Sequence, residues 1–347
     1  MERGIVAALG AAVLFGASTP MAKTLVGEMS PLLLAGLLYL GSGIGLGVVL
    51  MLRAATSGTR SIIRPRGADL VWLLAAVVVG GLIGPYLLMY GLRLTDSASA
   101  SLILNLEGVL TALLAWFAFK ENVDRRIAFG MTLIVAGGAL LSMGPALRAG
   151  GLAGPLAIAG ACLAWAIDNN LTRKVSSNDA MLTACIKGLV AGPCSLALAL
   201  SSGAHLPAGI LLLQAGLLGF VGYGLSLTLF VLALRRLGTA RTGAYFSLAP
   251  FIGAALAVAL GAPLTTPLIA AGLLMGCGVW LHLTERHAHR HRHSAQEHEH
   301  SHSHDAHHRH AHGTDWDGRE PHSHPHVHDP IEHDHAHYPD VHHRHGH

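Results

Sequence analysis

The chain has few charged side chains for its length, and this scarcity excludes most soluble folds. Asp, Glu, Lys and Arg make up 12% of its 347 residues, whereas a soluble domain has about 25%. Apolar residues make up 52% of the chain, and the mean hydropathy is +0.48. This composition predicts a protein whose solvent is largely a lipid bilayer, and we expect no nucleic-acid partner.

Cysteine is scarce as well. The four cysteines, Cys162, Cys185, Cys194 and Cys277, lie in apolar stretches without close pairing. Such cysteines are typical small membrane residues, and no disulfide is expected.

Long apolar runs, in contrast, fill most of the sequence. A helix needs about 17–25 apolar residues to cross roughly 30 Å of hydrocarbon. Ten runs qualify: Gly4–Val26, Pro31–Leu52, Leu70–Leu92, Ala98–Phe119, Ile127–Met143, Pro155–Thr172, Ala180–Leu200, Gly209–Leu234, Thr242–Gly261 and Leu268–Leu283. The sequence therefore predicts an all-α polytopic membrane protein with ten transmembrane helices.

The cations between these runs predict the orientation. With the N-terminus in the cytoplasm, the inside segments hold thirteen Lys and Arg residues, and the outside loops hold two, Arg93 and Arg148. Cytoplasmic loops carry the excess of cations. We therefore expect a plasma or inner membrane protein with both termini in the cytoplasm.

The two halves of the membrane region resemble each other. A shift of 142 residues pairs ten identical residues, among them Arg93 with Arg235 and Gly130 with Gly272. A shift of 150 pairs Phe15–Lys23 with Trp165–Arg173. Because five helices are an odd number, two such repeats have opposite orientation, which is the usual framework of secondary transporters. We expect repeats at 1–145 and 146–285, and a tail at 286–347.

The stretch LTDSASASLILNLEGVLTALLAWFAFKENVDRRIAFGMTLIVAGGALLS, from Leu94 to Ser142, and its partner from Leu234 to Leu260 resemble the drug/metabolite transporter superfamily, in particular its EamA-type branch. The resemblance implies ten helices in two inverted five-helix repeats and transport, often export, of small metabolites or drugs. The family often has proline at the position of Gly108, and Pro250 keeps it in the second half.

Glu107, Asp168 and Lys187 are charged residues that lie more than one helical turn inside the predicted spans, where each costs about 2.5–3.5 kcal/mol on insertion scales. Glu107 is ten residues into its span, about 15 Å deep, and Asp168 and Lys187 lie nearer the cytoplasmic end. One interpretation is a structural salt bridge, Glu107 or Asp168 with Lys187, that joins the two halves. The other is a substrate or proton site, because a carboxyl group removed from water can exchange protons near neutral pH.

Three amides lie near these charges in the sequence. Asn105, Asn169 and Asn170 are candidates to donate hydrogen bonds to a bound solute. Together with Glu107, Asp168 and Lys187 they form the predicted substrate-binding or coupling set. No enzyme activity and no required cofactor are expected.

The tail holds 23 of the 25 histidines, and residues 287–347 carry five cations against ten acidic residues. It has no apolar periodicity, so it is predicted to be disordered. Histidine-rich tracts bind metals such as Zn, Ni and Co, and the densest stretch is HEHSHSHDAHHRHAH. The predicted metal ligands are His298, His300, His302, His304, His307, His308, His310 and His312. A pH sensor is the alternative, since histidine titrates near pH 6.

HEHSH also matches the zinc-protease pattern His-Glu-x-x-His, but that pattern requires a helix, which nothing here predicts.

Three functions remain open on the sequence. The first is a secondary transporter, an exporter, of a small organic metabolite or drug that works by alternating access. The second is a transition-metal exporter whose tail collects cytoplasmic Ni, Co or Zn. The third is a metal-sensing membrane protein that does not transport. A homodimer is compatible with each.

Overall fold

The computed structural model describes residues 2–57, 68–119, 125–142, 151–173, 180–237, 242 and 245–284, and four short tail segments, 288–292, 296–302, 322–328 and 332–336. The chain divides into two compact units, Met1–Glu285 and Arg286–His347. In the described part of the first unit, all regular secondary structure is helical. The predicted all-α polytopic class is confirmed.

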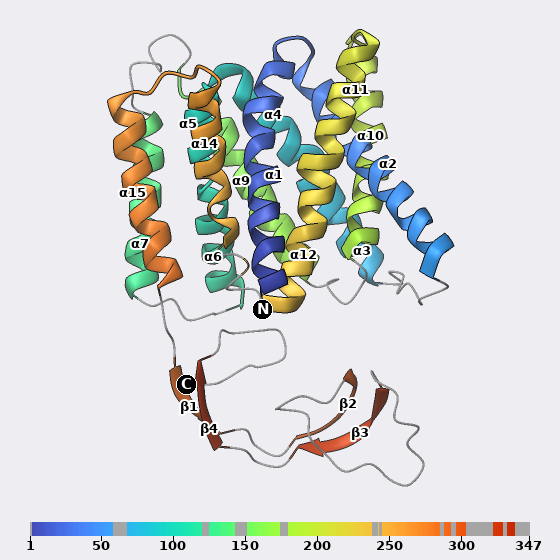
Figure 1. The fold of residues 1–347 in the computed structure, drawn as a ribbon, viewed down its shortest axis with the longest axis vertical. Helices are drawn as coiled ribbons and strands as arrows, with labels where there is room; N and C mark the ends of the chain where they lie inside the picture. The colour runs from blue at the N-terminus through green and yellow to red at the C-terminus, as the bar shows by residue number, and fades with distance from the viewer. Residues whose placement is uncertain are drawn as a thin grey trace. The chain divides into compact units, whose positions relative to one another are not determined.

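The helices of the first half follow the predicted runs closely (Figure 1). Their bounds are α1 Glu2–Val26, α2 Pro31–Ser57, α3 Ala68–Ala76, the π-helical η1 Val77–Ile83, α4 Gly84–Leu94, α5 Ser97–Ile103, α6 Leu106–Phe119 and α7 Arg125–Ser142. Here α3, η1 and α4 form one continuous span, and α5 and α6 form another.

The second half has the same order of elements. Their bounds are α9 Ala153–Arg173, α10 Ala180–Ser201, α11 Gly209–Leu218, the π-helical η2 Gly219–Leu225, α12 Ser226–Leu237, α14 Ala249–Ala259 and α15 Thr266–Leu283. Each of the ten predicted spans thus coincides with, or overlaps, a helix or a consecutive set of helices.

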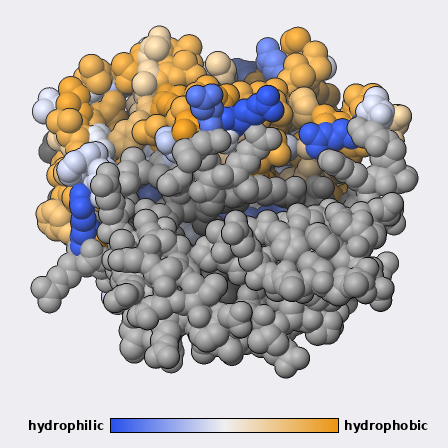
Figure 2. All heavy atoms as spheres, turned by 60° about the horizontal axis from the view of Figure 1, so that its bottom comes forward, coloured by the Kyte–Doolittle hydropathy of each residue, from blue (hydrophilic) through white to orange (hydrophobic). Residues whose placement is uncertain are grey.

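Six helical segments of the described residues are long and apolar enough to cross a membrane, and three shorter ones, Arg126–Ser142, Ala249–Ala259 and Thr266–Leu281, are also apolar. Large hydrophobic side chains face outward, for example Phe117 and Leu273, which are 74% and 71% exposed. Figure 2 shows hydrophobic residues over much of the visible surface of the described helices. Lipid tails solvate such a surface, whereas water would not.

Both halves depart from the α-helix at matching places. The segments η1 and η2 begin 142 residues apart, which is the shift that aligned the two halves by sequence. Leu104 and Asn105 interrupt the fourth span, and Ser247 and Leu248 form a turn before α14. Asn105 and Leu248 both donate their backbone N–H three residues back, to the carbonyls of Leu102 and Tyr245. Discontinuous helices and π-helical turns are common at functional sites.

Helix packing follows the same pattern. Helix α1 packs against α12 and α14, and α9, its counterpart in the second half, packs against α4 and α6. Helices α2 and α10, and likewise α7 and α15, are counterparts that pack directly on each other, and α5 of the fourth span packs on α14 of the equivalent ninth span. Small residues make these contacts close, since a methyl group on Gly43 would lie 2.6 Å from the backbone nitrogen of Leu189.

The tail was predicted to be disordered, but its four described segments form β-strands. Strand β1 (Ala288–Arg292) pairs antiparallel with β4 (Glu332–Ala336), and β2 (Gln296–His302) pairs antiparallel with β3 (His322–His328). A two-stranded ladder without an apolar face is at best marginally stable in water. The absence of a packed core in the tail as a whole therefore stays a prediction.

Candidate functional site

A buried ion pair joins two consecutive helices of the second half. Lys187 of α10 lies 2.6 Å from Asp168 of α9, and the two side chains are only 11% and 10% exposed. Thr172 donates a hydrogen bond of 3.0 Å to the same carboxylate from one turn along α9. The carboxylate is therefore fully engaged by groups of its own half.

This pairing differs from the structural interpretation of the sequence, in which the salt bridge joined the two halves. The contact with the first half is made by Gly80 of η1 instead. A methyl group on Gly80 would lie 2.6 Å from Asp168 Cβ, so only glycine leaves room for the aspartate there. The Gly80 carbonyl also accepts hydrogen bonds from Tyr39, at 2.8 Å, and Trp165 Nε1, at 3.1 Å.

Glu107 forms a separate contact in the first turn of α6. Asn169 of α9 donates a hydrogen bond of 3.0 Å to Glu107 Oε1. Glu107 is partly exposed and Asn169 is exposed, whereas the neighbouring Asp168 is buried. The adjacent residues Asp168 and Asn169 thus place the buried ion pair with Lys187 beside the hydrogen-bonded pair Asn169–Glu107, which a solute can reach.

The other two predicted amides bond locally. Asn105 donates to the carbonyl of Leu102, in the interruption of its span, and approaches the sulfur of Met275 at 3.8 Å. Asn170 donates to the Ala166 carbonyl of its own helix at 2.8 Å. The structure therefore pairs Glu107 with Asn169, and Asp168 with Lys187. The side chains of Asn105 and Asn170 instead donate to backbone carbonyls of their own spans.

Sequence reasoning missed an aromatic cluster that lies between the two halves. Phe15 of α1 lies 6.3 Å from Trp165 and 6.0 Å from Tyr223 of η2, by ring centroids. Tyr39 of α2 lies 6.0 Å from Tyr223, and Phe246 lies 5.5 Å from Phe15. The one signal that pointed here was the alignment of Phe15 with Trp165, which shows an aromatic ring at the same place in each repeat.

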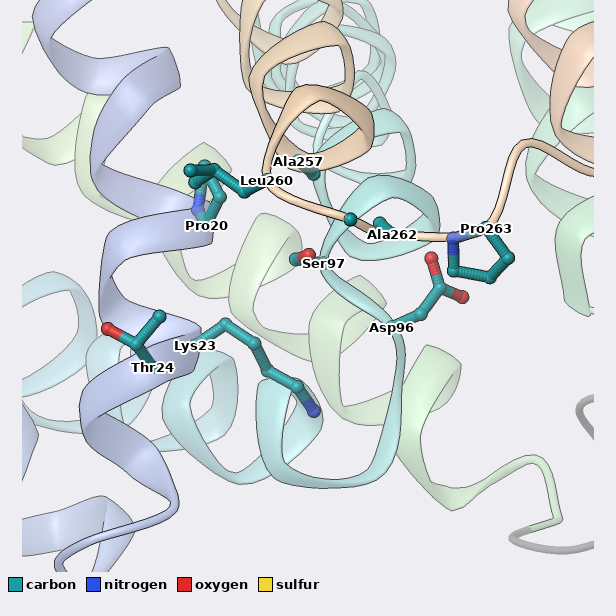
Figure 3. Close-up of a pocket in the computed structure, with 10 residues that line it drawn as sticks. Pro20, Lys23, Thr24, Asp96, Ser97, Ala257, Leu260, Ala262 and Pro263 are labelled. Carbon is teal, nitrogen blue, oxygen red and sulfur yellow. The ribbon is translucent and has the colours of Figure 1, made fainter.

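A cavity of about 290 Å³ lies where α1 and α14 end and α5 begins (Figure 3). Its polar lining includes Lys23 and Asp96. The Lys23 amine donates to the carbonyls of Leu92 and Thr95 at the end of α4, and Asp96 accepts from the Ser99 N–H at the start of α5. Both charges thus stabilise helix ends.

Helices α1, α5 and α14 come into close contact about one helical turn away from this cavity. Gly16, Gly253 and Ser101 lie four residues from the lining residues Pro20, Ala257 and Ser97 respectively. A methyl group on Gly253 would lie 2.7 Å from the Gly16 carbonyl oxygen and 2.8 Å from Ser101 Oγ. Backbone contact between the halves thus forms the floor of the cavity.

The cysteines and the predicted metal ligands are the remaining candidate residues. All four cysteines are free, as expected. No group of three or more His, Cys, Asp or Glu able to hold a metal ion occurs among the residues that the structure describes. His304, His307, His308, His310 and His312 lie outside the described residues.

The fold and this set of polar groups within apolar helices are those of a polytopic membrane protein, in which such groups usually serve a substrate or proton path. The sequence profile of the EamA-like transporter family matches residues 2–143 and 152–284. The chain therefore belongs to the EamA-like transporter family, and the resemblance found in the sequence is confirmed.

Two curated relatives carry transporter names. An "Uncharacterized transporter" of Methanothermobacter thermautotrophicus is 27% identical over 80% of this chain and 85% of its own length. The "Uncharacterized transporter YyaM" of Bacillus subtilis is 24% identical over 78% of this chain and 90% of its own length. A solved structure described only as "Crystal structure of protein" shares the fold, with a TM-score of 0.59, 21% identity, and 79% and 94% of the two chains covered. The chain is thus a multi-pass membrane transporter of the drug/metabolite type and not an enzyme.

Proposed function

We propose that this transporter exports a small organic solute by alternating access between two inverted repeats, and that Glu107 and Asn169 contact the solute or its coupling proton. The observation that carries the proposal is the Asn169–Glu107 hydrogen bond, which is accessible and lies next to the buried Asp168–Lys187 pair. Ionisable groups within a membrane helix are costly and usually serve a substrate or proton path.

Three observations support the inverted repeat. The family profile matches two ranges that correspond to the two halves. The π-helical segments lie 142 residues apart. Helix α1 packs on α12 and α14 of the second half, and its counterpart α9 packs on the equivalent helices α4 and α6 of the first half. Two similar halves that each have an odd number of spans must have opposite orientation, so that one can rock against the other.

The cavity at Lys23 and Asp96 supports alternating access from the other end. It lies between α1 and α5 of the first half and α14 of the second, and the Gly16–Gly253 contact closes its floor. A contact between two moving halves that has no interlocking side chains can open without breaking hydrogen bonds. We therefore assign this contact as the outer gate, with both termini in the cytoplasm of the cell.

The second candidate is export of a transition metal that the tail collects. The 23 tail histidines favour it, whereas the absence of a ligand cluster among the described membrane residues favours an organic solute. In either case we propose that the tail binds Zn, Ni or Co through its histidines. A homodimer is compatible with both candidates.

A flux assay in proteoliposomes tests the transport proposal. Purified full-length chain is screened with labelled amino-acid-like metabolites and with Zn²⁺, Ni²⁺ and Co²⁺. For the solute that moves, Glu107→Gln should lower the flux at least tenfold, or remove its dependence on pH, because the amide oxygen can still accept from Asn169 but the amide does not ionise.

Glu28→Gln is the matched control, since Glu28 is an exposed carboxylate in the turn between α1 and α2. It should leave the flux unchanged. Normal flux at every pH in the Glu107→Gln protein would reject the assignment of the site, and flux of a metal alone would favour the second candidate.

A further inference from the structure

The two ladders of the tail place histidine opposite histidine. The four described strands contain eleven histidines, and ten of them face another histidine in the register. The eleventh, His328, is opposite Gln296. The five pairs are His289–His335, His291–His333, His298–His326, His300–His324 and His302–His322.

These pairs occupy every second position, so they lie on one face of each ladder. On the other face of the first ladder, two register pairs have opposite charge, Arg290 with Asp334 and Arg292 with Glu332. Opposite charges across a strand pair stabilise its register by about 0.2–1 kcal/mol each. The sequence thus supports this register on both faces of the ladder.

A shift by a single residue would remove the pairing. It would place His300 opposite Ser323 or Pro325 instead of His324. Because the side-chain period of a strand is two, such a slip moves a whole set of residues to the other face. The second ladder has no pairs of opposite charge, so without a ligand its two registers differ little in free energy, since neither buries an apolar core.

We propose that divalent metal ions fix this register, with each ion shared by one histidine pair that joins the start of the tail, 288–302, to its later part, 322–336. This inference rests on the proposed metal binding by the tail. It changes the ligand set, however, because the partners of His298, His300 and His302 come from the distant strand β3 and not from the adjacent run 304–312.

The chemistry fits borderline metals. Directly opposite residues in an antiparallel pair have Cβ atoms about 4.5–5.5 Å apart, within reach of two imidazoles on one ion with bonds of about 2.0–2.1 Å. Zn²⁺, Ni²⁺ and Co²⁺ accept imidazole readily, and water or carboxylate completes the coordination. Two histidines per ion give several exchangeable sites of modest strength, which suits a collector better than a store.

The pairing makes a prediction that independent local sites do not. Three variants of the full chain carry three His→Gln changes each: at 298, 300 and 302, at 322, 324 and 326, and, as the control, at 308, 310 and 312. Two combined variants join the 298–302 changes with the 322–326 changes or with the 308–312 changes. The number of Zn²⁺ ions bound per chain is measured for all five variants and the unchanged chain by equilibrium dialysis in detergent.

If pairs share ions, the 298–302 and 322–326 variants each lose about the same two to three ions, and their combination loses no more than either alone. Combining the 298–302 set with the 308–312 set should instead give additive losses. Additive losses for both combinations would overturn the pairing, although the tail would still bind metal. A full chain that binds no more Zn²⁺ than one ending at Glu285 would reject the proposed metal binding itself.

A distance measurement provides a second, independent test. Ser301 and Ser323 are register partners that lie between histidine pairs, so their replacement leaves the proposed ligands intact. Spin labels at these two positions should give one short distance with Zn²⁺ and a broad distribution with a chelator. A distribution that Zn²⁺ does not narrow would contradict the shared-ion model.

Discussion

The buried pair of Asp168 and Lys187 allows stability and function to be separated by experiment. With exposures of 10% and 11%, each charge depends on the other for most of its electrostatic stabilisation. Removal of one partner from a buried pair costs about 3–5 kcal/mol, whereas removal of both is often neutral or stabilising. Lys187→Met should therefore lower the melting temperature in detergent by roughly 10 °C, at about 2–4 °C per kcal/mol.

The double variant Asp168→Asn, Lys187→Met should recover most of that loss, since asparagine keeps the shape that fits against Gly80. Asn170→Ala is the control in the same helix, and it removes one local hydrogen bond worth about 1 kcal/mol. Thermal unfolding and proteoliposome flux are measured on the unchanged protein, both single variants Asp168→Asn and Lys187→Met, the double variant and Asn170→Ala.

Two results are informative about the role of the pair. A stable double variant with normal flux identifies a structural pair, and a stable double variant without flux identifies a pair needed for transport. The pair is not energetically coupled if Lys187→Met destabilises the protein no more than Asn170→Ala does. The same conclusion follows if the losses of stability from Asp168→Asn and Lys187→Met simply add in the double variant.

Three further predictions concern the gate, the orientation and the tail. Gly253→Leu should hold the outer gate open and raise the labelling of Glu107→Cys by an impermeant maleimide several-fold. Gly278→Leu, at the equally tight α7–α15 contact, should leave that labelling unchanged. Equal labelling in the two variants would contradict the assignment of the gate. Ser97→Cys, in the cavity, should react with that reagent in intact cells, and reaction only after lysis would invert the topology. A chain ending at Glu285 should keep its helical unit and its flux at saturating solute, and a lower melting temperature would show that the tail contributes to the fold.

The class of the protein and the location of its helices follow from the order of its amino acids. Apolar runs of membrane length specify spans because the bilayer interior offers no hydrogen-bond partners to the backbone. The shift of 142 residues also anticipated where η2 follows η1. Glu107, Asp168 and Lys187 stood out because charge is rare and costly in such runs.

The pairing of those charges was decided by tertiary structure alone. Depth along a helix is readable from the sequence, but the direction in which a side chain points around the helix depends on how neighbouring helices pack. That packing placed Lys187 on Asp168 rather than Glu107, and Asn169 rather than Asn170 on Glu107. It also created the contact of Gly80 with Asp168, the aromatic cluster at Phe15 and the outer cavity, because each of these joins residues from separate helices that no sequence period relates.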